Sequence, residues 1–62
     1  MNLDDLSKRL NEALVSKSLR VVAANCNVSH ELIRKLALSA KGANLTVASY
    51  NKIDAGLRAN GF

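Results

Sequence analysis

The helical pattern of apolar residues is interrupted once in the middle of the chain, at residues 25–29, whose sequence is NCNVS. Asn and Ser favour turns and helix caps over helix interiors, because their short polar side chains compete for backbone hydrogen bonds. Apolar residues recur at helical spacing on both sides: Leu19, Val22, Ala23 and Cys26 before the interruption, and Ile33, Leu36 and Ala37 after it. The pattern predicts two short helices, at about 19–26 and 30–39, joined by a tight turn.

The flanking segments are predicted to be helical too. A similar apolar stripe runs from about residue 3 to 15 behind the capping residue Asn2, and Ser18 then caps the helix at 19–26. Residues 39–44 are predicted to form a loop around Gly42. A fourth helix, capped by Thr46 and fraying at Gly61, carries Val47, Tyr50, Ile53 and Leu57. No stretch alternates with period two for long enough to be a strand, so the predicted class is all-α.

A chain of 62 residues has room for one core, and we expect a single domain over residues 1–62 that is marginally stable on its own. No uncharged stretch, including 21–29 and 42–51, is long enough to cross a membrane, and nothing resembles a leader peptide, so we expect a cytoplasmic protein. One cysteine cannot form an internal disulfide, and with one histidine it offers too few ligands for zinc. We expect no metal, cofactor or small-molecule ligand.

The two middle helices meet the steric demands of a helix-turn-helix at about 19–38. Ala23 provides a small side chain where the second helix crosses the first. Four residues later the turn requires a left-handed residue, and Asn27 is the type that tolerates this conformation best after Gly. Val28 follows as the inward anchor of the turn, and Ile33 and Leu36 form the inner face of the next helix.

At these residues the chain resembles the lambda-repressor-like helix-turn-helix family, in particular its small Cro-type phage repressors. The resemblance extends to the preceding helix and to the segment NLTVASYNKIDAGLRA, and it covers roughly residues 3–60. It implies a compact domain of four helices, or of five where a further C-terminal helix is present. It also implies sequence-specific binding of double-stranded DNA by a phage or prophage transcriptional repressor, which would act on the nucleoid of a bacterial cell.

The resemblance assigns base reading to the outward face of helix 30–39. The residues expected there are Ser29, His30, Glu31, Arg34 and Lys35, with Leu38 at the end of the same face. Arg34 or Lys35 would donate to guanine, and His30 to guanine or a phosphate. Glu31 has two alternative roles of equal weight: it accepts from cytosine N4, or it orients Arg34 or Lys35 through an ion pair along the helix.

Phosphate contacts are expected at the starts of two helices, because free backbone amides there favour anions. The residues expected to make them are Lys17, Ser18, Arg20, Lys41, Asn44 and Thr46. The net charge of +4 and the isoelectric point near 9.7 favour a polyanionic partner. We leave Lys8, Arg9, Lys52 and Arg58 unassigned, since a basic residue on a helix usually lies on a solvated face.

One recognition helix reads too few base pairs for selectivity in a genome, so we expect a weak homodimer that assembles on a near-palindromic operator. Leu57 and Phe62 are the predicted dimer surface. The alternative is a small helical protein-interaction module, such as an anti-repressor or adaptor, which would use the apolar residues Val21, Leu38 and Phe62.

An enzyme is not expected. Cys26 lies on an apolar stripe with no basic residue positioned to activate it, which favours a small buried hydrophobic residue over a nucleophile. Asp54 with Glu31 or Asp5 would be the candidate acid–base pair, but no pattern fixes the distance between them.

Overall fold

A computed structural model describes residues 2–39 and 45–62. Within these ranges the chain forms no strand and four helices: α1 (Leu3–Ser16), α2 (Leu19–Cys26), α3 (His30–Leu38) and α4 (Val47–Ala59). The predicted all-α class and the four predicted helices are confirmed, with boundaries that differ by a residue or two. The predicted loop around Gly42 falls largely outside the described residues.

Each helix begins at a residue whose side chain accepts a hydrogen bond from a backbone amide in the first turn. Such a bond satisfies an amide that has no partner within the helix. The side chain of Asn2 accepts from the amide of Asp5, and that of Ser18 accepts from the amide of Val21. The side chain of Ser29 accepts from the amide of Leu32, and that of Thr46 accepts from the amide of Ser49. The short polar breaks between the apolar stripes therefore fix where the helices start.

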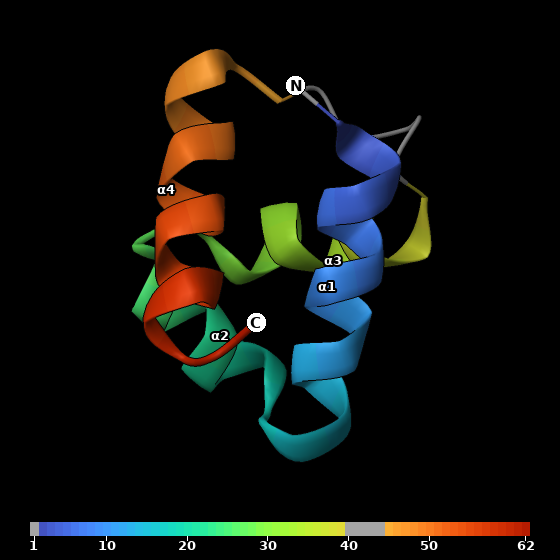
Figure 1. Cartoon of the computed structure of the whole chain (residues 1–62), viewed down its shortest axis with the longest axis vertical. Coiled ribbons are helices and arrows are strands. Elements are labelled where there is room, and N and C mark those ends of the chain that lie inside the picture. Colours follow the sequence, from blue (N-terminus) through green and yellow to red (C-terminus); the bar gives the residue numbers. More distant parts are fainter. Residues whose placement is uncertain (1, 40–44) are drawn as a thin grey trace.

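The helices surround a single core. In Figure 1, α1 and α4 stand on either side of the view, α2 lies at the base and α3 crosses behind. α2 packs against each of the other three helices, whereas α3 packs on α1 and α2 but not on α4. α1 and the eight-residue α2 both contact α3 and α4, and together they join these two helices.

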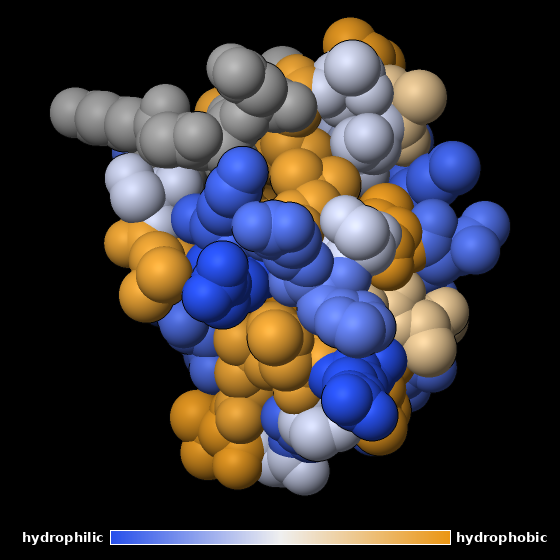
Figure 2. All heavy atoms as spheres, turned by 180° about the vertical axis from the view of Figure 1, so that it is seen from behind, coloured by the Kyte–Doolittle hydropathy of each residue, from blue (hydrophilic) through white to orange (hydrophobic). Residues whose placement is uncertain are grey.

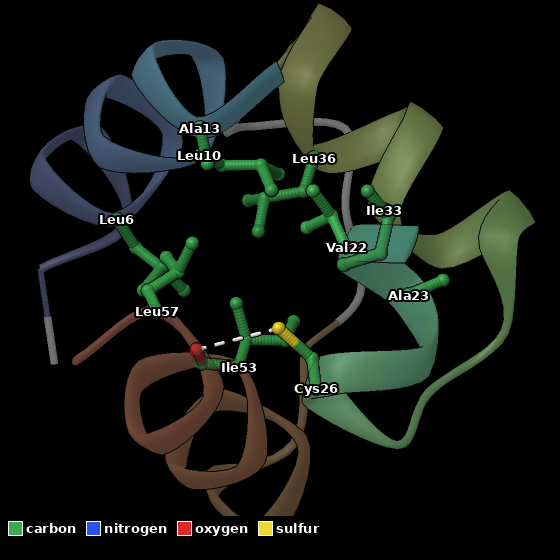
Figure 3. Close-up of a cluster of buried hydrophobic side chains, with 10 residues drawn as sticks. All are labelled: Leu6, Leu10, Ala13, Val22, Ala23, Cys26, Ile33, Leu36, Ile53 and Leu57. Atoms are coloured by element: carbon green, nitrogen blue, oxygen red, sulfur yellow. Dashed lines mark hydrogen bonds between the residues drawn. The ribbon is translucent and has the colours of Figure 1, made fainter. Parts of the chain in front are cut away.

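All four helices contribute side chains to the core (Figure 3). Its apolar members are at most 2% exposed, and no polar side chain is buried among the described residues. The core consists of Leu6, Leu10, Ala13, Val22, Ala23, Cys26, Ile33, Leu36, Ile53 and Leu57. Val47, expected on the stripe of α4, is instead 66% exposed, since the first turn of α4 extends past this cluster.

The prediction that Leu57 belongs to a dimer surface is wrong. Leu57 is 1% exposed, because it continues the inward stripe of α4 and points into the core (Figure 3). Phe62 is partly buried and packs against the same cluster, while its amide donates to the carbonyl oxygen of Leu57 at 2.8 Å. Leu57 therefore has no surface to offer to a second copy.

α2 and α4 approach each other closely at Cys26 and Gly56. A Cβ atom on Gly56 would lie 2.7 Å from the sulfur of Cys26, 2.8 Å from its Cα and 2.9 Å from the carbonyl oxygen of Asn25. The thiol donates to the carbonyl oxygen of Ile53 at 3.6 Å, and burial raises the pKa of Cys26. The prediction that Cys26 is a small buried side chain is confirmed.

We expect Gly56→Ala to destabilise the protein by about 1–3 kcal/mol, because two of the three close atoms belong to the backbone and the helices must move apart. Urea unfolding followed by circular dichroism measures the change. Ala55→Gly, on the exposed side of α4, provides the control: it loses helix propensity alone, about 1 kcal/mol. A Gly56→Ala variant more stable than the parent would contradict the close crossing.

Candidate nucleic-acid interface

The turn between α2 and α3 is formed by a left-handed residue. Asn27 has φ 56° and ψ 45°, and its amide faces the carbonyl oxygens of Ala23 and Ala24. The amide of Val28 donates to the carbonyl oxygen of Ala23 at 3.1 Å, and the Val28 side chain packs against the core. The chain thus reverses within the three residues between α2 and α3, which are Asn27, Val28 and Ser29. The predicted conformation of Asn27 is confirmed.

This turn gives α3 one buried and one exposed face. Ile33 and Leu36 are fully buried. The five predicted base-reading residues, Ser29, His30, Glu31, Arg34 and Lys35, are all exposed, and Leu38 is 79% exposed. In Figure 2, which is turned by 180° from Figure 1, the side on which α3 lies shows a band of hydrophilic side chains next to apolar areas.

Glu31 and Arg34 form an ion pair along the outward face of α3. Their nearest charged atoms are 3.6 Å apart, and both side chains are more than half exposed. Exposed pairs of this kind contribute little to stability, so either side chain can leave the other at small cost. The ion pair through which Glu31 would orient Arg34 is present in the structure, and the Glu31 carboxylate still has oxygens free to accept further hydrogen bonds.

The predicted phosphate-binding residues fall into three groups. Ser18 and Arg20 are exposed at the start of α2, and Lys17 directly before them is partly buried. Thr46 caps α4, and α4 does not pack on α3. The packing of the helices therefore gives no evidence that Thr46 lies beside α3. Lys41 and Asn44 lie outside the described residues.

An open groove of about 280 Å³ joins the start of α2 to the outward face of α3. Its lining residues are Leu19, His30, Glu31 and Arg34. The sequence assigned Leu19 only to the apolar stripe of α2, yet its side chain both packs against the core and borders the groove. Helical periodicity does not reveal such a residue, because the groove depends on how α3 crosses α2.

Arg9 is the centre of a second polar cluster, which the sequence did not reveal. Its Nη1 lies 2.6 Å from Oδ1 of Asp54 and 3.8 Å from Asp5, while its Nε donates to the carbonyl oxygen of Phe62 at 2.7 Å. Nε of Arg58 lies 3.2 Å from the other oxygen of Asp54. The hydrogen bond from Arg9, assisted by Arg58, lowers the pKa of Asp54. Asp5 and Asp54 thus share one guanidinium, and the arrangement stabilises the ionised form of Asp54.

Residues 2–39 and 45–62 contain neither a metal-binding cluster nor a membrane-spanning helix. In these ranges, His, Cys, Asp and Glu side chains nowhere gather in threes that could hold a metal ion. No helix there has the length and apolar character needed to cross a membrane.

Comparison with known proteins adds no relative. No protein-family model matches the chain, and neither a curated protein nor a solved structure matches it. The interpretation of the interface therefore depends on the sequence pattern and on the geometry of the helices.

We expect Asn27→Gly to leave stability unchanged or to raise it slightly, and Asn27→Val to lower it by about 1–2 kcal/mol. The reason is the positive φ of Asn27, which glycine adopts freely and a β-branched residue does not. Thermal unfolding of the two variants measures the difference. Equal stabilities would show that the left-handed turn is misplaced.

The Arg9 cluster predicts a pH-dependent loss of stability. Because the pKa of Asp54 is lowered in the folded state, its contribution is present above the ordinary aspartate pKa of about 4 and is lost as the pH falls through the folded-state value. We expect Asp54→Asn to cost about 1–2 kcal/mol at pH 7 and clearly less near pH 2.5. Urea unfolding at both pH values measures this, with Glu12→Gln, at an exposed position, as control. A deficit of the same size at both pH values would rule out the ionised pair.

Proposed function

We propose that the protein binds double-stranded DNA in a sequence-specific manner and acts as a small transcriptional repressor of the Cro type, of phage or prophage origin. The observation that carries this proposal is the left-handed turn at Asn27, from which α3 projects with Ile33 and Leu36 buried and a row of polar residues exposed. An α-helix presented in this way fits the major groove of B-DNA.

The distribution of charge supports the same partner. The segment from residue 17 to 38 carries four basic residues, Lys17, Arg20, Arg34 and Lys35, and a single acidic one, Glu31. α1 instead carries more acidic than basic residues, and its Arg9 is engaged by Asp54 and Asp5. The excess positive charge is therefore concentrated in the helix-turn-helix, where phosphates would approach.

In this proposal Arg34 or Lys35 donates to a guanine edge, and His30 donates to guanine or a phosphate. Glu31 accepts from a base amino group or orients Arg34 or Lys35 through an ion pair along the helix. The predicted phosphate contacts next to α3 are those at the start of α2, where Ser18 and Arg20 flank backbone amides that precede the first hydrogen bonds within the helix. These contacts position the protein and leave base selection to α3.

Pairing of two copies on DNA belongs to the same proposal. A single α3 would read roughly four or five base pairs, so useful selectivity requires two half-sites about one helical turn apart. Because Leu57 is buried, Phe62 is the residue of the predicted dimer surface that remains partly exposed. Such a repressor would work in the cytoplasm of a bacterial cell, on its nucleoid.

A protein-interaction module is the second candidate, and exposed apolar side chains favour it. The side chain of Leu38 is 79% exposed and that of Val21 is 46% exposed, so neither belongs to the core. A helical adaptor or anti-repressor would cover such side chains with a partner helix. The dependence of binding affinity on salt concentration distinguishes the two functions. The affinity for DNA falls steeply between about 50 and 200 mM salt, whereas the affinity of an apolar protein interface hardly changes.

Selection from a pool of random DNA duplexes tests the proposal. We expect one near-palindromic motif to be enriched and the parent to lose affinity steeply with salt. Lys35→Ala should weaken binding to that motif by roughly 5- to 150-fold, since a base contact is worth about 1–3 kcal/mol. Lys52→Ala, at an exposed position on α4, is the matched control and should bind nearly as the parent does. Failure to enrich any motif would overturn the proposal.

A further inference from the structure

The groove between α2 and α3 combines one apolar side chain with three polar ones. Leu19 is the only apolar residue in its lining, and His30, Glu31 and Arg34 form the rest. Because Leu19 also packs against the core, its position is set by the fold, whereas the three polar side chains are exposed. The groove therefore offers a fixed apolar wall on the side of α3 that carries the proposed base-reading residues.

The chemistry of this lining is unlike that of a phosphate site. The carboxylate of Glu31 repels an anion, and its ion pair with Arg34 at 3.6 Å already neutralises part of the local positive charge. An apolar wall also contributes nothing to phosphate binding. The lining instead contains a hydrogen-bond acceptor, two potential donors and an apolar surface, which is a combination suited to the edge of a base pair.

Among the unmodified base pairs, only the pair of thymine with adenine shows a matching pattern in the major groove. It presents the 5-methyl group and the O4 acceptor of thymine, together with the N6 donor and the N7 acceptor of adenine. Leu19 complements the methyl group, Glu31 the adenine amino group, and Arg34 or His30 the acceptors. A guanine–cytosine pair has only the C5–H group of cytosine at that position, so Leu19 would lose the methyl group against which it packs.

We propose that this groove binds the major-groove edge of a thymine–adenine pair, with Leu19 packed against the thymine 5-methyl group as a specificity-determining contact. The inference rests on the proposed DNA binding and adds to it the identity of one base pair and a reading residue outside α3. Removal of one buried methyl group corresponds to a change in affinity of about three- to fivefold for each half-site.

Deoxyuridine supplies the test, because it differs from thymidine only in lacking the 5-methyl group. Two pools of random duplexes, one made with thymidine and one with deoxyuridine, are selected with the parent protein. We expect the parent to enrich a motif with a fixed thymine in each half-site from the first pool, and to lose the preference at that position in the second. In a single duplex carrying the motif, replacing this thymine by deoxyuridine should weaken binding by three- to fivefold per half-site.

Two variants then assign the effect to the groove. Leu19→Ala should bind the thymidine and deoxyuridine duplexes equally, whereas Val21→Ala should keep the preference of the parent. Val21 is the matched control, since it is an aliphatic residue on the same helix that does not line the groove. The comparison of the two duplexes with the parent protein needs no variant, so it stays decisive even if Leu19→Ala lowers stability.

The outcomes separate this inference from the proposed function. Enrichment of no motif from either pool would overturn DNA binding itself. A motif enriched equally well from both pools, without loss of affinity for deoxyuridine at any position, would leave DNA binding intact and overturn the role of the groove. A thymine preference that persists in Leu19→Ala would assign the methyl contact to another side chain and also overturn it.

Discussion

The reversal of the chain at Asn27 is the constraint on which the rest of the molecule depends. α2 has only eight residues and packs against the other three helices, so its own inner face provides little more than Val22, Ala23 and Cys26. A left-handed residue at the end of α2 lets α3 return across it at once, and the amides of Asn27 and Val28 bond back to Ala23 and Ala24. With an extended connection the small core would lose Ile33 and Leu36, two of its largest side chains.

So small a core also limits where polar groups can lie. No polar side chain is buried in the part of the chain that the structure describes, and the polar residues act at its edges, as helix caps and in the cluster around Arg9. The outward face of α3 lies outside both sets and keeps its charged residues exposed. The fold thus leaves that face free for recognition, which is the property that the proposed function uses.

The sequence predicted the features that depend on neighbours along the chain. Asn2, Ser18 and Thr46 were recognisable as caps because each precedes an apolar stripe, and the left-handed residue Asn27 was recognisable because it lies four residues after Ala23. Contacts between distant segments were missed: the bonds of Arg9 to Asp54 and Phe62, the contact of Gly56 with Cys26, and the groove beside Leu19. The wrong assignment of Leu57 to a dimer surface also came from a missed tertiary contact. Its periodic position on α4 matched the core, but its place near Phe62 at the end of the chain suggested a surface.

The bond from Arg9 to the carbonyl oxygen of Phe62 has a consequence for the dynamics of the domain. It joins residues 53 positions apart, so nearly the whole chain, with the turn at Asn27 inside it, forms one closed loop. Segments at the ends of small domains ordinarily fray at little cost in free energy. Here α1 and the segment after α4 hold each other, so that loosening either one breaks the cluster that restrains the other. This coupling favours cooperative opening of α1 and α4 over independent fraying.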